Sequence, residues 1–141
     1  MTAAGGEAAG VVVASAWVHT RERHVLVVRP AGSDAFYLPG GKPEPGETYA
    51  EAAAREVKEE VGIVLDAAGL TLFTEIVAPA HNRPPGTEVR LICFTGGTPD
   101  DEPRAAAEIA EVDWFTRADA ARCAPAIRLL LAALGDAGLI D

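Results

Sequence analysis

Three glutamates lie close together along the chain: Glu56, Glu59 and Glu60, in a segment whose apolar spacing predicts a helix. At about 100° per residue, separations of three and four residues place all three carboxylates on one side of that helix. Like charges at such spacing destabilise a helix by roughly 0.2–0.5 kcal/mol per pair unless a cation compensates them. Hard oxygen ligands without a nearby histidine or thiolate favour Mg²⁺ or Mn²⁺, and Mg²⁺ usually completes its shell with water and substrate phosphate. The cluster therefore predicts a divalent metal site that serves phosphate chemistry.

The alternative interpretation is a solvated acidic helix face that Arg55 and Lys58 neutralise. The preceding loop favours the metal site, because residues 39–46 are rich in glycine and proline and lead directly to the start of the helix. Glycines allow positive φ angles and a close approach of the backbone to a ligand. A backbone carbonyl that is exposed in such a turn can itself bind a hard metal ion.

The helix that carries the glutamates has sequence signals at both ends. Thr48 followed by Glu51 fits a capping box at its start, and Gly62 is a natural terminator. Its apolar stripe consists of Ala50, Ala53, Ala54, Val57 and Val61. This stripe predicts that one side of the helix packs against the core.

Apolar runs and turn residues predict the other elements. They are strands at 11–18, 24–29, 36–38, 70–77, 89–95 and 112–115, and a last helix at 125–134 that stops at Gly135. The first two strands follow one another across a short polar turn, so we expect them to pair as a hairpin. Strand 89–95 has no clearly polar face, which predicts a central position. Together the elements indicate an α+β fold with a mixed β-sheet between helices.

The composition is that of one globular domain, with 141 residues of which 49% are hydrophobic and 23% charged. We expect residues 1–9 to form a flexible tail and residues 10–141 to form the domain. The formal charge of −9, from 12 Lys and Arg against 21 Asp and Glu, disfavours nucleic acid and anionic membranes as partners. Cys93 and Cys123 make no disulfide framework or zinc spacing, so both are expected in the core. No segment has the length of a membrane span, so a cytoplasmic location is expected.

The segment around the glutamates also resembles a known sequence pattern. Gly41 is followed after five residues by Glu47, and after seven more by the run from Arg55 to Ile63, REVKEEVGI. This arrangement is similar at every defined position to the signature of the MutT-like Nudix hydrolases. The resemblance implies the Nudix fold, in which a mixed sheet lies between helices in an α/β/α arrangement. It also implies Mg²⁺- or Mn²⁺-dependent cleavage of a nucleoside diphosphate linked to another moiety.

The same resemblance implies which oxygen atoms bind the metal. It makes Glu59 and Glu60 direct ligands, and Glu56 a further ligand or the general base. The carbonyl of Gly40 is implied as an extra ligand. Glu108 lies in a segment that resembles the family's loop with an additional carboxylate, before a late tryptophan-containing strand. It is therefore expected to be a ligand or the base.

Other residues are expected to support the site or to contact the substrate. Glu47 and Arg55 resemble the pair that joins loop and helix in this family and orients the metal-binding carboxylates. Five residues could contact substrate phosphates, although each cation alone also fits an ordinary surface position: Gly41, Lys42, Arg29, Arg83 and Arg90. Tyr37 is among the aromatic residues that could stack on a base.

The sequence leaves several substrates open. The leading interpretation is a nucleoside triphosphate, including a damaged one, which is cleaved to the monophosphate and pyrophosphate. The alternative is ADP-ribose or another nucleotide sugar, because some ADP-ribose hydrolases of the family carry a proline about sixteen residues after the signature, where this chain has Pro79. A non-catalytic nucleotide-binding module is a second alternative, but such modules usually lack signature carboxylates that this chain retains. The chain is expected to act as a monomer or a homodimer.

Overall fold

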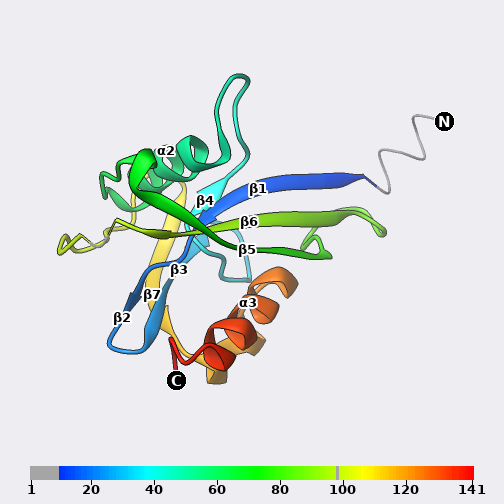
Figure 1. Cartoon of the computed structure of the whole chain (residues 1–141). Helices are drawn as coiled ribbons and strands as arrows, with labels where there is room; N and C mark the ends of the chain where they lie inside the picture. The colour runs from blue at the N-terminus through cyan, green and yellow to red at the C-terminus, as the bar shows by residue number, and fades with distance from the viewer. Residues whose placement is uncertain (1–9, 98) are drawn as a thin grey trace.

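Two β-sheets form the centre of the molecule, with helices on opposite sides (Figure 1). The computed structural model describes residues 10–97 and 99–141. The predicted tail, residues 1–9, lies outside the described residues. Helix α2 (Tyr49–Val61) covers one side and helix α3 (Pro125–Asp136) covers the other. This arrangement confirms the predicted α+β fold, although the strands form two sheets instead of one.

The larger sheet has the order β4 (Gly40–Gly41), β1 (Val11–Trp17), β6 (Glu88–Gly96) and β5 (Leu70–Pro79). β1 runs parallel to β6 and the other two pairs are antiparallel, so the sheet is mixed as predicted. β6 lies between two neighbours, which confirms the central position expected from its apolar faces. The short strand β4 holds the glycine-rich loop directly beside β1.

The smaller sheet is antiparallel and has the order β2 (Thr20–Arg21), β3 (His24–Pro30) and β7 (Ile109–Phe115). The predicted hairpin between strands 11–18 and 24–29 is wrong, because β1 and β3 belong to different sheets. β3 turns back onto β2 instead. Apolar runs indicate that a strand forms and is buried, but they do not choose its partner, and β1 pairs along its whole length with β6.

Phe36 and Tyr37 form isolated bridges where a strand over 36–38 is expected. Tyr37 is bridged to Val28, and Phe36 to Cys123. These bridges attach the segment to β3 and to the chain just before α3. The segment therefore links β3 to the residues before α3 without forming a regular strand.

Several other boundaries differ from the predictions by one to three residues, and the sequence does not predict two short 3-10 helices, η1 (Ala67–Gly69) and η2 (Arg117–Arg122). β7 begins earlier than the expected range 112–115. Helix α3 continues past Gly135, where a Cβ would lie 2.0 Å from Cδ of Arg117. This glycine allows η2 to pack closely against α3, and it does not end the helix.

Apolar side chains on both sides of the sheets form the core. The buried residues of α3 are Ala126, Ile127, Leu130, Leu131 and Leu134, and those of α2 are Ala52, Ala53, Val57 and Val61. The stripe of α2 thus includes Ala52, whereas the predicted Ala50 and Ala54 are half-buried. Cys93 and Cys123 are free and buried, as predicted. No helix in the described part of the chain is long and apolar enough to span a membrane.

Candidate active site

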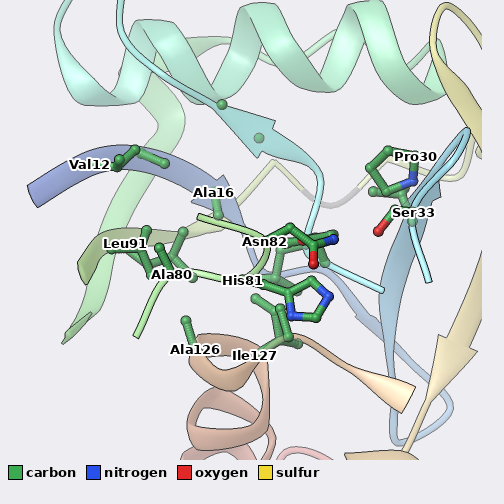
Figure 2. Close-up of a pocket in the computed structure, with 18 of the residues that line it drawn as sticks. Val12, Ala16, Pro30, Ser33, Ala80, His81, Asn82, Leu91, Ala126 and Ile127 are labelled. Atoms are coloured by element: carbon green, nitrogen blue, oxygen red, sulfur yellow. The ribbon is translucent and has the colours of Figure 1, made fainter. Parts of the chain in front are cut away.

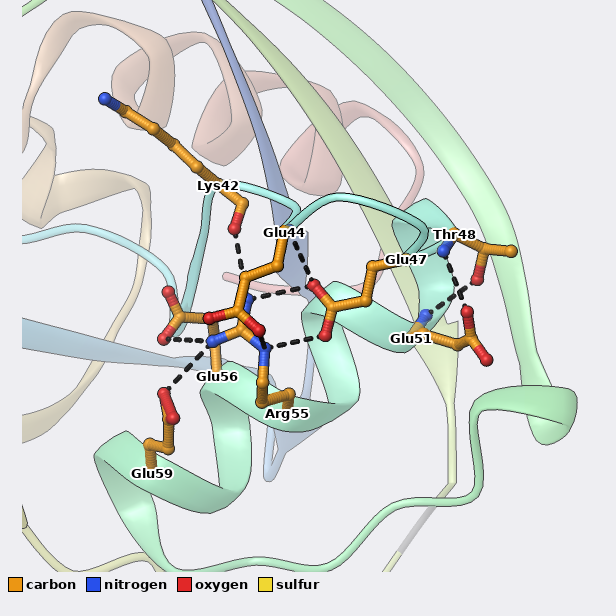
Figure 3. A network of polar contacts seen from close by, with 8 residues as sticks. All are labelled: Lys42, Glu44, Glu47, Thr48, Glu51, Arg55, Glu56 and Glu59. Atoms are coloured by element: carbon orange, nitrogen blue, oxygen red, sulfur yellow. Dashed lines mark hydrogen bonds and ion pairs between the residues drawn. The ribbon is translucent and has the colours of Figure 1, made fainter.

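Helix α2 carries the three glutamates, and local interactions set both of its ends. Thr48 accepts a hydrogen bond from the backbone N–H of Glu51, whose side chain accepts one from the backbone N–H of Thr48 (Figure 3). Gly62 adopts the left-handed conformation, with φ of 75°, directly after the last residue of the helix. The predicted capping box and the predicted terminator are both confirmed.

Arg55 connects the helix to the glycine-rich loop (Figure 3). Its Nε donates to Oε2 of Glu47 at 2.7 Å, and its Nη2 donates to Oε1 of the same residue at 3.0 Å. Nη2 also donates to the backbone carbonyl of Lys42 at 3.1 Å. The hydrogen bonds from Arg55 lower the pKa of Glu47, which keeps this carboxylate ionised. A forked ion pair therefore fixes the loop against the helix, in the position that the resemblance implies.

Two of the three clustered glutamates share Arg55 as a partner, and the third contacts the glycine-rich loop. Nη1 of Arg55 lies 3.2 Å from Oε1 of Glu59 and 3.4 Å from Oε1 of Glu56. Oε1 of Glu60 accepts a hydrogen bond from the backbone N–H of Gly40 at 3.1 Å. Burial raises the pKa of Glu56 to about 7 and the pKa of Glu60 to about 8. One arginine thus offsets only part of the negative charge, and a cation would lower the pKa of both carboxyls.

The donor atoms fit a hard divalent cation, although they do not form a closed cage. Among residues 10–97 and 99–141, no three acidic, histidine or cysteine side chains converge into a ready-made metal site. Mg²⁺ commonly needs only one or two carboxylates, because water and substrate phosphates supply its other ligands. Gly41 leaves space for one of these carboxylates, since a Cβ there would lie 1.6 Å from Oε2 of Glu56. The candidate ligands are Glu56, Glu59, Glu60 and the carbonyl of Gly40.

We expect Glu47→Gln to lower kcat by roughly 10-fold and to lower the melting temperature. The amide keeps the size of the side chain but loses the charge that holds Arg55, which would then turn further towards Glu56 and Glu59. Steady-state assays and thermal unfolding measure the two effects, with Glu88→Gln, an exposed position on β6, as the matched control. A lower melting temperature with an unchanged kcat would limit the ion pair to a structural role.

A cavity of about 510 Å³ opens beside Glu60, between the larger sheet, the start of α3 and two loops (Figure 2). Its apolar lining includes Val12, Ala14, Ala16, Leu91, Ala126 and Ile127. Gly41, Lys42 and Arg83 also line it, so three of the five expected substrate contacts face this cavity. A volume of ~300–1,000 Å³ is typical of a small-molecule site.

The other two expected phosphate contacts, Arg29 and Arg90, lie outside the cavity lining. Nε of Arg29 is 3.0 Å from Oε1 of Glu111 on β7. Nη2 of Arg90 is 2.7 Å from Oε1 of Glu75 on β5. Each guanidinium is therefore engaged by a carboxylate of the neighbouring strand, and these ion pairs account for both arginines without a substrate.

Glu108 is exposed and lies just before β7. Its backbone carbonyl accepts a hydrogen bond at 2.7 Å from the N–H of Ala31, a residue of the cavity lining. Two residues earlier, the N–H of Ala106 donates to the carbonyl of Glu60 at 3.0 Å. The backbone thus places this segment next to both the cavity and the last turn of α2.

Three polar residues without an assigned role in the sequence, Ser33, His81 and Asn82, also line the cavity (Figure 2). Nε2 of His81 lies 2.8 Å from Oδ1 of Asp34, and its ring centroid is 6.3 Å from that of Tyr37. Tyr37 lines the cavity, and burial raises the pKa of its hydroxyl. These residues come from two loops that are far apart in the sequence, so no spacing signal connects them.

Known proteins resemble this chain over most of its length. The model of the family described as NUDIX domain matches residues 10–134. The 8-oxo-dGDP phosphatase NUDT18 of Homo sapiens is 35% identical over 104 residues, which are 70% of this chain and 30% of that protein. The protein of the same name from Mus musculus is 32% identical over 99 residues, which are 66% of this chain and 28% of that protein. The chain thus spans less than a third of the length of these curated relatives.

Solved structures share the fold. The MutT protein from Methanosarcina mazei Go1 has a TM-score of 0.73 and 21% identity, with coverage of 92% of this chain and 96% of that chain. An Ap4A hydrolase from C. elegans has a TM-score of 0.65 and 21% identity, with coverage of 89% and 96%. At these identities, the likeness shows a common architecture of sheets and helices.

Proposed function

The chain belongs to the Nudix family, and from this premise we propose that it is a metal-dependent hydrolase of nucleotide phosphoanhydride bonds. One observation carries the proposal: the cavity of about 510 Å³ is lined by Glu60 as well as by Gly40 and Gly41. A nucleotide in the cavity would therefore reach the carboxylate cluster with its phosphates. Mg²⁺ or Mn²⁺ is the proposed cofactor, because every candidate ligand is a hard oxygen atom.

The residues around the cavity divide into two groups. Glu56, Glu59, Glu60 and the carbonyl of Gly40 would hold the metal, with Glu108 as a further candidate from the neighbouring segment. When bound, the metal would neutralise phosphate charge and lower the pKa of an attacking water. Lys42 and Arg83 would contact phosphate oxygens, because both line the cavity. Glu47 and Arg55 would hold the glycine-rich loop and α2 in a fixed relative position.

The proposed reaction breaks one bridging P–O bond. The oxygen of water forms a bond to phosphorus, and the bridging oxygen leaves with the other phosphate group. One proton of the water passes to a carboxylate, for which Glu56 and Glu108 are the candidates. No covalent nucleophile is required, so the protein contributes position and charge.

The proposed substrate is a nucleoside triphosphate, which would yield the monophosphate and pyrophosphate. Tyr37 and His81 both line the cavity, with ring centroids 6.3 Å apart, and they would offer an aromatic face and a ring nitrogen to a base. Two other substrates have specific support. The name of NUDT18 favours an oxidised deoxyguanosine diphosphate, which would yield the monophosphate and phosphate. Pro79, which lines the cavity, favours ADP-ribose, which would yield AMP and ribose 5-phosphate.

A substrate panel tests the proposal. We expect kcat/KM for nucleoside triphosphates to exceed that for ADP-ribose by at least about tenfold, a difference of about 1.4 kcal/mol in transition-state stabilisation. The panel should include undamaged and 8-oxo forms of dGTP and dGDP, with release of phosphate and pyrophosphate measured separately. A tenfold preference for ADP-ribose would reverse the choice of substrate. Tight binding of nucleotides without turnover would instead favour the non-catalytic module.

A further inference from the structure

Ser15 of β1 carries a buried hydroxyl without a hydrogen-bond partner. The residue is fully buried, with 0% exposure, and its Oγ has no partner in the structure of residues 10–97 and 99–141. A buried hydroxyl that makes no hydrogen bond destabilises the folded state. An alanine would occupy the same space without this cost. The presence of a serine at this position would be explained if its hydroxyl forms a hydrogen bond in another state of the site.

The neighbours of Ser15 on its strand show which way its side chain points. Val13 packs in the hydrophobic cluster that contains Ala53 of α2, and Trp17 packs in the cluster that contains Val57 of α2. Alternate residues of a strand face the same side of the sheet. Ser15 lies between Val13 and Trp17 in this alternation, so its side chain faces α2, the helix that carries the glutamates.

The residue paired with Ser15 places it beside one of these glutamates. Ser15 is opposite Gly41 in the β1–β4 pair, and a Cβ on Gly41 would lie 1.6 Å from Oε2 of Glu56. Directly paired residues point to the same face, with Cβ atoms about 5 Å apart. The carboxylate of Glu56 therefore occupies the space that a side chain opposite Ser15 would fill.

We propose that Ser15 is a positioning residue, whose hydroxyl donates a hydrogen bond to the Glu56 carboxylate when this carboxylate binds the divalent metal. The inference rests on the proposed function, because it needs the metal. Nη1 of Arg55 lies 3.4 Å from Oε1 of Glu56 and attracts this carboxylate. A hydrogen bond from the Ser15 hydroxyl would hold the Glu56 carboxylate in its metal-binding orientation and would also give the hydroxyl its missing partner. Ser15 is among the residues that line the cavity, and it would contribute to metal affinity through Glu56 without binding the metal itself.

Direct binding of Mn²⁺, measured by electron paramagnetic resonance without nucleotide, tests the proposal. We expect Ser15→Ala to raise the Kd for Mn²⁺ by about 10-fold, while its metal-free melting temperature stays at or above that of the wild type. Ser15→Cys has similar size and a weaker donor, so its Kd should lie between the two. In assays at limiting metal, Ser15→Ala should need more Mn²⁺ for half-maximal rate, with the KM for nucleotide unchanged at saturating metal.

Each other outcome has a defined meaning. Equal Mn²⁺ affinity of Ser15→Ala and wild type would overturn the proposal and leave Ser15 as a packing residue, while the proposed function would stand. A lower metal-free melting temperature of Ser15→Ala would also overturn it, because the hydroxyl would then have a partner without metal. Failure of the wild type to bind Mn²⁺ would overturn both this inference and the metal dependence in the proposed function.

Discussion

Removal of divalent metal by excess chelator should abolish nucleotide hydrolysis, and Mg²⁺ or Mn²⁺ should restore it. The reason is the imbalance of charge on α2, where burial raises the pKa of Glu56 and Glu60 and one arginine serves the cluster. A metal that binds only the folded state should also stabilise it, by about 2.7 kcal/mol at 100 times its Kd. Release of phosphate or pyrophosphate and thermal unfolding measure the two effects.

Two controls make this result specific. Glu88→Gln alters an exposed glutamate on β6, away from the cluster, and should keep the full metal-induced rise in melting temperature. Glu60→Gln should lose most of that rise, because it removes a candidate ligand charge. Unchanged turnover in excess chelator would contradict the metal dependence, whatever the effect on stability.

Glu60→Gln should lower kcat by at least about 100-fold and raise the metal-free melting temperature at neutral pH. The amide oxygen can still accept the hydrogen bond from Gly40, but it cannot replace the charge of a ligand. Burial raises the pKa of Glu60 to about 8, so the folded protein binds this proton more tightly than the unfolded chain. Stability therefore falls as the pH rises from the ordinary pKa of a glutamate towards 8, and the neutral variant does not have this loss.

Measurements of kcat and of melting temperature with and without metal separate the two roles of Glu60. The variant Glu88→Gln again serves as the control and should match the wild type in both. A Glu60→Gln variant with nearly full kcat and a lower melting temperature would assign this carboxylate to structure. The metal site would then have to be sought elsewhere around the cavity.

Local signals explain which parts of the fold could be predicted. Helix α2 has its capping residues, Thr48 and Glu51, and its terminator, Gly62, within its own segment, so its range follows from neighbouring residues. No local signal identifies the strand that pairs with β1. Its apolar run is compatible with either sheet, and pairing with β6 depends on residues much later in the chain.

The same distinction applies to the site. The ion pair of Arg55 with Glu47 joins positions eight residues apart, and the signature contains both. The contact of His81 with Asp34 joins loops 47 residues apart, so it appears only in three dimensions. The sequence suggests Arg29 as a phosphate contact, but in the structure it forms an ion pair with Glu111 on the neighbouring strand. Sequence alone could not show this ion pair, because the two residues are far apart along the chain.

The parallel pairing of β1 with β6 has a consequence for the synthesis of this chain. Val11 pairs with Glu88 and Trp17 with Phe94. β1 therefore cannot pair with β6 until the ribosome has made the chain as far as Phe94. Helix α2 can form earlier, because its caps are local. Contacts between such distant segments slow folding, since the loop between them must close first. During translation the carboxylates of α2 are thus presented on a helix before β6, the parallel partner of β1, has been made.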